Sequence, residues 1–208
     1  MKRVIRLTGM LLLVGIIAVS CTSKKPEKTI ESLKSAIIGE TNANAKYQAF
    51  SLKAAEEGYP NIAKMFVAAT EAEAIHVKNH NAVLVKLGED VFHPIAEIPE
   101  VSTTEDNLQS AINGETHEFT EMYPGFIPIS IEEKVDGAIT TYTWAKYAEE
   151  SHAKLYTQTL EILRETKSDE KVASVWYVCP KCGNLFNDIE GVLHCPVCGD
   201  LSETFLEF

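Results

Sequence analysis

A glutamate and a histidine three residues apart interrupt an apolar helical stripe between Ile131 and Arg164. The stripe recurs at alternating steps of three and four residues, the spacing of one face of a long helix. Its members are Val135, Ala138, Tyr142, Ala145, Glu149, His152, Tyr156, Thr159 and Leu163. Such a face packs against other helices, where an unpaired charge costs several kcal/mol, so a cation is the natural partner for Glu149 and His152. The stripe therefore predicts a metal site inside a helical bundle.

A second stretch, which begins at Pro60, carries the same Glu-x-x-His motif on a similar apolar stripe, with Glu73 and His76. A single match to so short a motif has a high risk of arising by chance. Two matches on two long apolar stripes are harder to dismiss. The two motifs together favour one shared site to which both helices contribute.

Two further predicted helices supply glutamates without a histidine. Their apolar stripes place Glu40 on the inward face of one helix, and Glu115 and Glu118 on the inward face of the other. Four helices that each turn a carboxylate inward, two of them with histidine, match the ligands of ferritin-like dinuclear bundles. The sequence therefore predicts a mainly α protein, a ferritin-like four-helix bundle with a two-metal site.

The breaks between the predicted helices set their order. We expect the first helix near residues 29–57 and the second from Pro60 to Gly88. Residues 89–102 contain two prolines and no periodicity, and they predict a long crossover that lets the second and third helices run parallel. Pro124 is expected to end the third helix, and residues 128–130 to lead into the fourth.

The end of the chain has a different character. Two Cys-x-x-Cys-Gly knuckles, with Cys179 and Cys182 in the first and Cys195 and Cys198 in the second, stand twelve residues apart. Four thiolates at this spacing predict a tetrahedral metal site, and the geometry suits zinc and iron almost equally. A disulfide framework is the weaker alternative. A module of about 34 residues is too small to remain folded without a metal.

The beginning of the chain has the pattern of an export signal. Three basic residues precede an apolar run of 14 residues, which is shorter than the ~20 of a membrane span but suits a signal-peptide core. Cys21 follows Ala18-Val19-Ser20 in a sequence that resembles a bacterial lipobox. We expect cleavage after residues 1–20, lipidation of Cys21 and a tether over residues 21–28. A plain secretory signal and an uncleaved anchor remain the alternatives.

The charge of the chain limits its partners. It has 19 basic and 30 acidic residues, a formal net charge of −11. Cleavage after residue 20 would remove three basic residues and no acidic one, which changes the net charge to −14. This excess of negative charge argues against nucleic acid and anionic membrane surfaces as partners.

Taken together, these motifs resemble the rubrerythrin family, whose members join a four-helix di-iron domain to a rubredoxin-like domain. The resemblance covers nearly all of the expected mature chain. It rests on Gly39-Glu40 with Tyr47, Glu73-x-x-His76, Gly114-Glu115-x-x-Glu118 with Met122-Tyr123-Pro124, Glu149-x-x-His152 and the two cysteine knuckles. The export signal departs from the family, whose members are usually cytoplasmic, and it leaves the electron donor open.

The resemblance implies a peroxidase that reduces hydrogen peroxide to water, with a ferritin-like di-iron domain over residues 29–167 and a rubredoxin-like domain over residues 175–208. Glu73 and Glu149 would bridge two irons, and the histidine of each Glu-x-x-His would bind one of them. The four-cysteine iron would relay electrons from a rubredoxin-like or membrane-linked donor. The expected lipid anchor, and not the resemblance, would place the chain at the cell envelope, periplasmic or on the outer face.

The remaining roles also follow from the resemblance. Glu40 and Glu115 would be terminal ligands, and Glu118 the family's additional carboxylate, which exchanges with His76 at one iron on reduction. Tyr47 and Tyr123 would orient carboxylates. His80, one turn after His76, is more readily explained as a buried structural histidine than as a ligand.

Electron delivery predicts an assembly. Glu149 lies 18 residues before Lys167, about 27 Å along a helix at ~1.5 Å per residue. We therefore expect a chain's own tail iron to lie too far from its own di-iron site, and a head-to-tail homodimer to bring the two together. Two other functions stay open: ferritin-like iron storage, and a zinc-ribbon binding module on a helical scaffold.

Overall fold

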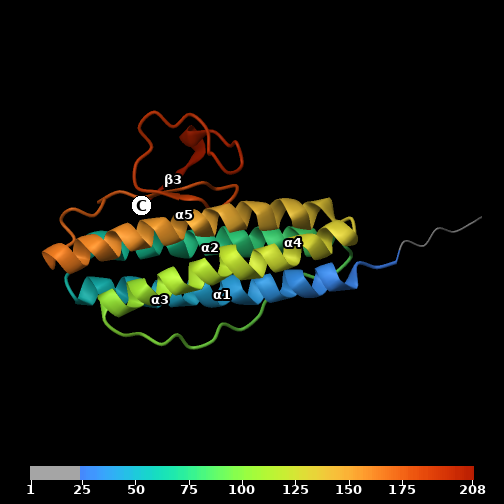
Figure 1. Ribbon diagram of the computed structural model, residues 1–208, viewed down its shortest axis with the longest axis horizontal. Coiled ribbons are helices and arrows are strands. Elements are labelled where there is room, and N and C mark those ends of the chain that lie inside the picture. The colour runs from blue at the N-terminus through green and yellow to red at the C-terminus, as the bar shows by residue number, and fades with distance from the viewer. Residues whose placement is uncertain (1–23) are drawn as a thin grey trace, which may run out of the picture.

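The structure is a computed structural model that describes residues 24–208 (Figure 1). The expected signal peptide and Cys21 lie outside the described residues. The helical part consists of α1 (Glu27–Glu56), α2 (Pro60–Lys86), α3 (Thr104–His117), the π-helical turn η1 (Glu118–Met122), α4 (Tyr123–Glu132) and α5 (Asp136–Thr166). No helix within residues 24–208 is both long and apolar enough to cross a membrane.

The helices form an elongated bundle of two pairs. α1 packs mainly against α2, and α3 and α4 pack against α5. The crossover of residues 87–103 runs along the outside of α1, so that α2 and α3 point in the same direction (Figure 1). The backbone amide of Glu97 in this crossover donates a 2.9 Å hydrogen bond to the side-chain oxygen of Asn42 on α1.

The core of the bundle is divided into two apolar clusters. Along α1, Ile30 to Ile37 belong to one cluster and Ala43 to Ala54 belong to the other. The same division recurs on α2 and on α5. Buried polar residues occupy the layer between the clusters on all three helices, so the apolar stripes enclose a polar centre instead of a continuous core.

The third helix differs from the prediction. Pro124 does not end it, because the chain continues through η1 into α4, where Pro124 lies in the first turn and its missing N–H is tolerated. The expectation that residues 128–130 form a connection is also wrong, since Pro128 is inside α4. The break comes at residues 133–135, where Lys134 has a φ of 58°.

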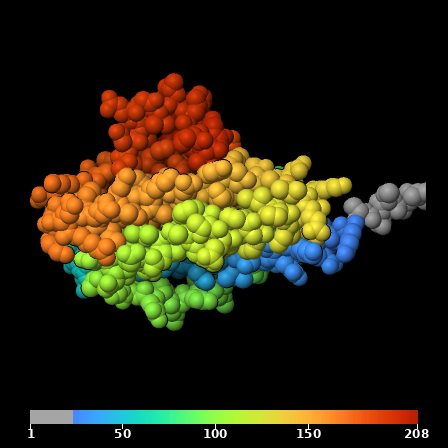
Figure 2. Space-filling model, in the orientation of Figure 1, coloured from blue at the N-terminus to red at the C-terminus, as the bar shows by residue number. Residues whose placement is uncertain are grey.

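The tail is a small three-stranded antiparallel sheet that lies on α2 and α5. Its elements are β1 (Tyr177–Val178), β2 (Leu185–Phe186), the 3-10 turn η2 (Ser202–Thr204) and β3 (Leu206–Glu207), with the strand order β2-β1-β3. In Figures 1 and 2 the chain leaves the end of α5, turns back along the bundle and places the sheet over its middle.

Candidate metal centres

The polar layer between the two apolar clusters collects six of the predicted ligands from four helices. They are Glu40 of α1, Glu73 and His76 of α2, Glu115 of α3, and Glu149 and His152 of α5. Each is at most 1% exposed. Buried carboxylates are rare unless they are paired or bind a metal, so their convergence from four helices is the main chemical feature of the bundle.

The ligand atoms divide into two overlapping groups. One group consists of Glu40, Glu73, His76 and Glu149, and the other of Glu73, Glu115, Glu149 and His152, each with its ligand atoms within 4.8 Å of one another. Glu73 and Glu149 belong to both groups. Two adjacent metal positions with two shared carboxylates follow from this overlap.

The distances around the shared carboxylates are similar on the two sides, except for the longer one between His152 and Glu73. His76 Nδ1 lies 2.9 Å from Glu73 Oε2 and 2.8 Å from Glu149 Oε1. On the other side, His152 Nδ1 lies 2.8 Å from Glu149 Oε2 and 3.6 Å from Glu73 Oε1. Each Glu-x-x-His thus contributes one histidine to its own side and one carboxylate to both sides.

Several of these atoms are buried but have no hydrogen-bond partner among residues 24–208. They are Glu40 Oε2, Glu73 Oε1, both carboxylate oxygens of Glu149 and His152 Nδ1. A buried polar atom without a partner costs ~1–3 kcal/mol, and more when it is charged. All five belong to the two ligand groups, where cations would satisfy them. The residues present therefore fit two metal ions.

The pKa values of the buried carboxylates also favour bound cations. Burial, together with the charge of Glu149, raises the pKa of Glu40 to about 8. Burial likewise raises the pKa of Glu115 and Glu118 well above the ordinary value of 4.5. Without cations, several of these acids would hold protons at neutral pH. Two divalent ions would displace those protons.

Glu73, His76 and His152 are instead favoured in their charged forms. Burial alone would raise the pKa of Glu73, but the adjacent imidazoles of His152 and His76 lower it to about 2. Burial opposes charge on His76 and His152, yet the adjacent Glu149 carboxylate raises the pKa of both well above 6.5.

Both predicted tyrosines donate hydrogen bonds to terminal carboxylates. The Tyr47 hydroxyl donates to Glu115 Oε1, and the Tyr123 hydroxyl donates to Glu40 Oε1. Both tyrosines are at most 1% exposed. Each tyrosine thus contacts one carboxylate, on opposite sides of the site.

Glu118 lies beside the six residues but in neither ligand group. It begins the π-helical turn η1, and its buried Oε2 has no hydrogen-bond partner in the described part of the chain. A π-turn inserts one residue into a helix and is frequent at functional sites. The insertion also brings Tyr123, eight residues after Glu115, back onto the inward face.

His80 belongs to neither ligand group either. Its Nε2 lies 3.1 Å from the Tyr123 hydroxyl and its Nδ1 lies 3.1 Å from Thr141 Oγ1. Burial, with the charge of His76, lowers the pKa of His80 to about 3, so the ring is neutral at neutral pH. The sequence interpretation overlooked Thr141, because it lies next to the apolar stripe of α5 and not on it.

The four tail cysteines converge as predicted. Their sulfur atoms lie within 4.8 Å of one another, and none of the four forms a disulfide. Each knuckle closes with the same backbone hydrogen bond, from Gly183 N to Cys179 O and from Gly199 N to Cys195 O, both 2.9 Å. The two glycines have φ angles of 80° and 75°, which favour glycine.

The first knuckle lies directly on the bundle site of its own chain. His76 Nε2 donates a 2.9 Å hydrogen bond to the carbonyl of Cys182, and His152 Nε2 donates a 3.1 Å bond to the carbonyl of Gly183. A Cβ atom at Gly183 would collide with the His76 ring. The expectation that a chain's own tail lies too far from its own site is therefore wrong in this structure.

The linker explains the error, because it turns back along α2 instead of leaving the bundle. Lys167, with a φ of 52°, reverses the chain after α5. Asp169 Oδ2 then accepts hydrogen bonds from the backbone amides of Asn61 and Ile62, at 2.6 and 3.2 Å. Val172 and Trp176 are buried in the same apolar cluster as the first half of α2.

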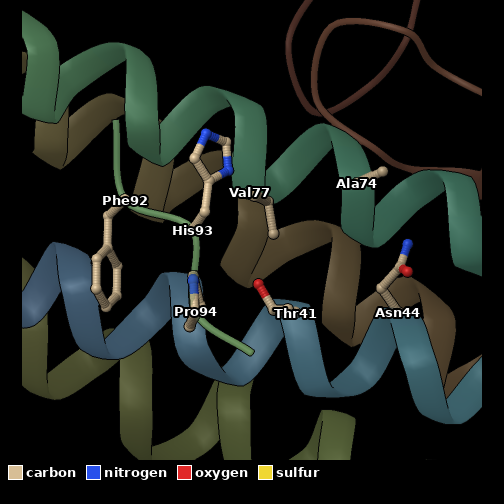
Figure 3. Close-up of a pocket in the computed structure, with 7 residues that line it drawn as sticks. All are labelled: Thr41, Asn44, Ala74, Val77, Phe92, His93 and Pro94. Carbon is tan, nitrogen blue, oxygen red and sulfur yellow. The ribbon is translucent and has the colours of Figure 1, made fainter. Parts of the chain in front are cut away.

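A cavity of about 250 Å³ lies elsewhere, between α1, α2 and the crossover (Figure 3). Figure 3 shows its seven lining residues: Thr41, Asn44, Ala74, Val77, Phe92, His93 and Pro94. None of them is a candidate ligand, and His93 is the one titratable residue among them. This cavity therefore adds no candidate ligand to those of the polar layer and the cysteine knuckles.

Known proteins place this arrangement in a family. The sequence profile of the rubrerythrin family matches residues 31–160, which contain all six clustered carboxylate and histidine residues. The chain belongs to the rubrerythrin family. It is 36% identical over 180 residues to nigerythrin from Nitratidesulfovibrio vulgaris, with 86% of each chain covered. It is also 36% identical over 189 residues to rubrerythrin-2 from Clostridium acetobutylicum, which covers 89% of this chain and 100% of the relative.

Solved structures extend the family likeness to the whole fold. A mixed-valence structure of nigerythrin has a TM-score of 0.79 at 33% identity and covers 98% of this chain and 100% of its own. A fully reduced, all-ferrous structure of nigerythrin has a TM-score of 0.77. An open-pore ferritin from Archaeoglobus fulgidus, with a TM-score of 0.61 and 16% identity, shares the bundle fold alone.

Two predictions are confirmed at this point. The fold is mainly α, with a ferritin-like bundle followed by a C-terminal four-cysteine cluster. The cofactor sites of this rubrerythrin-family chain are a di-iron carboxylate and histidine site and a four-cysteine site that suits iron or zinc.

Proposed function

We propose that this chain is a peroxidase that reduces hydrogen peroxide to water. As a member of the rubrerythrin family, the chain is a di-iron protein of oxidative-stress defence with an oxidoreductase-type role. The observation that carries the finer proposal is the contact between the first cysteine knuckle and both histidines of the bundle site. A storage protein has no need for an electron-transfer module at that place, and no observation favours a storage role or a zinc-ribbon binding role.

The residues of the bundle would divide the work. When bound, two ferrous ions supply the two electrons that cleavage of the O–O bond requires. Glu73 and Glu149 would hold both ions, with His76 and His152 on one each. Tyr47 and Tyr123 keep the Glu115 and Glu40 carboxylates oriented through their hydroxyl groups. Glu118 supplies a further carboxylate at the edge of the site.

Electron supply would follow the contact between the tail and the bundle. Cys182 is a predicted ligand in the four-cysteine site, and its carbonyl accepts the hydrogen bond from His76. The backbone of a ligand of the four-cysteine site thus contacts the imidazole of a ligand of the bundle site. We propose a rubredoxin-like or membrane-linked protein as the donor to the four-cysteine site.

A single-turnover experiment tests the proposed activity. The iron-loaded chain is reduced without oxygen and mixed with about 1.5 equivalents of hydrogen peroxide per chain, which accept the three electrons of two ferrous ions in the bundle and one in the tail. We expect peroxide to disappear and the red colour of a ferric four-cysteine site to return. Glu149→Ala should leave the peroxide unconsumed because it removes the ligand shared by both positions. Glu150→Ala, which changes the neighbouring half-exposed glutamate, should behave like the unaltered chain. Full turnover in Glu149→Ala would refute the proposal.

We also propose the division into a di-iron domain over residues 29–167 and a rubredoxin-like domain over residues 175–208. Export and anchoring through a lipidated Cys21 remain part of the proposal, with the chain on the periplasmic or outer face of the envelope. Mass spectrometry of the mature N-terminus tests this. A lipidated Cys21 at the first position is the expected result, and an intact Met1 or an unmodified Cys21 contradicts it.

The head-to-tail homodimer also remains a proposal. The distance argument for it no longer applies, because the tail reaches its own bundle. Mixing a chain that lacks Glu149 with one that lacks Cys198 separates the two routes. Recovered turnover in the mixture would support transfer between chains, and no recovery in proven heterodimers would restrict it to one chain.

A further inference from the structure

His80 is a buried polar residue that the proposed function does not use. Its side chain is 0% exposed, and both ring nitrogens have hydrogen-bond partners, Thr141 at Nδ1 and the Tyr123 hydroxyl at Nε2. His80 Nε2 comes no closer than 4.0 Å to Glu40, which is beyond hydrogen-bond distance. Its link to the carboxylate therefore passes through Tyr123.

The direction of each hydrogen bond in this link can be assigned. The Tyr123 hydroxyl has one hydrogen, which it donates to Glu40 Oε1. The Tyr123 oxygen must then accept the hydrogen of His80 Nε2. A neutral imidazole carries one N–H, so Nδ1 accepts and the Thr141 hydroxyl donates to it. The donors therefore run in one order, Thr141 to His80 to Tyr123 to Glu40.

The other side of the site has no such extension. Tyr47 donates to Glu115 as Tyr123 does to Glu40. Aromatic rings surround Tyr47, those of Phe50, Phe66 and Tyr156, with centroids 5.7–6.3 Å away. The nearby Tyr156 hydroxyl has no hydrogen-bond partner within the residues that the structure describes. The two halves of the site are thus alike in their ligands and different in what holds those ligands.

We propose that His80 is a positioning residue that fixes Tyr123 and, through it, the Glu40 carboxylate, and so strengthens metal binding at the His76 side of the site. A phenol oxygen that accepts a hydrogen bond becomes a better donor through its own O–H. Groups behind metal ligands typically change metal affinity ~10–100-fold. The inference rests on the proposed two-metal site but not on peroxide chemistry.

The tautomer of His80 is the first test and involves no activity. The full chain is loaded with zinc, which is diamagnetic, and its histidines are labelled with ¹⁵N. The His80 signals are assigned by their loss in His80→Gln. We expect two-bond ¹H–¹⁵N correlations of an Nε2–H ring. An Nδ1–H ring or a doubly protonated ring would overturn the proposed direction.

Metal affinity is the second test, measured by zinc titration of the bundle positions against a competing chelator. His80→Leu and Tyr123→Phe should each weaken one of the two dissociation constants by about 10–100-fold, and the double variant should lose little more. His80→Gln, whose amide can donate to Tyr123, should retain near-normal affinity. Tyr156→Phe, which removes an unpartnered hydroxyl, is the matched control and should change nothing.

Each other result counts against the proposal. Unchanged binding in His80→Leu would show that His80 does not act on the metals. Equal weakening of both positions would remove the selectivity for the His76 side. A His80→Gln chain as weak as His80→Leu would mean that the ring serves packing and not hydrogen bonding.

Discussion

At the level of single residues, two glutamates link the two halves of the candidate metal centre. Glu73 and Glu149 belong to both ligand groups, and each is followed three residues later by a histidine on the same helix face. This part of the site could be predicted from the sequence, because helical periodicity decides which residues share a face. Thr141 could not be predicted, since its role depends on where His80 and Tyr123 meet in space.

The protonation of the site predicts how the metal-free chain responds to pH. The pKa of Glu40 rises from 4.5 to about 8 on folding, and those of His76 and His152 rise above 6.5. Above these ordinary values the folded chain binds more protons than the unfolded chain, so the free energy of unfolding falls as pH rises. Glu73, with its pKa lowered to about 2, acts oppositely only below pH 4.5. His80, with its pKa lowered to about 3, acts oppositely below pH 6.5, where the raised pKa values of Glu40, Glu115 and Glu118 outweigh it.

We therefore expect the melting temperature of the metal-free chain to fall between pH 5 and pH 8. Added ferrous iron should raise it most at pH 8, because metal replaces the protons. Calorimetry with and without iron measures both effects. A melting temperature of the metal-free chain that rises over this range would contradict the assigned shifts.

At the level of elements, the π-turn and the linker are the parts that the sequence did not reveal. In the sequence, Pro124 predicts the end of a helix. In the structure it follows the π-turn and lies in the first turn of α4, where a missing N–H costs little. The sequence of the linker predicts a simple spacer. In the structure its Asp169 caps the first turn of α2, where it binds Asn61 and Ile62, 108 and 107 residues earlier in the sequence. Both depend on contacts that local patterns do not encode.

The cap predicts a specific loss of stability. Asp169→Ala removes the carboxylate that accepts from Asn61 and Ile62, and loss of such a cap costs ~0.5–2 kcal/mol. Denaturant unfolding measures the change. Glu170→Ala, one residue further along and exposed, is the control and should leave the stability unchanged. Equal stability of the two variants would mean that the cap does not contribute.

At the level of the whole molecule, the tail covers the bundle site of the same chain. The sequence predicted the helices, the ligand types and the cysteine knuckles because each depends on local spacing. The placement of the tail could not be predicted, because it depends on Val172 and Trp176 packing into the core of the bundle. Figure 2 shows the tail lying directly against α5.

Two glycines offer a matched test of this docking. Gly183 and Gly199 hold the same place in the two knuckles with similar positive φ, but only a Cβ at Gly183 would meet His76. Gly183→Ala should therefore separate the tail from the bundle, and two lost hydrogen bonds at about 1 kcal/mol each weaken docking roughly 30-fold. The linker should become more sensitive to protease while the four-cysteine site stays intact. Gly199→Ala should stay docked; equal sensitivity in the two variants would argue against the contact with His76.

Iron content tests the central claim, a two-metal centre in the bundle and a single metal in the tail. The chain is reconstituted with ferrous iron without oxygen, freed of unbound metal, and measured for iron per chain. The ligand groups predict three iron ions per chain, and one iron per chain when Glu73→Ala and Glu149→Ala are combined. A single iron in the unaltered chain, with no further loss in the double variant, would contradict the di-iron site.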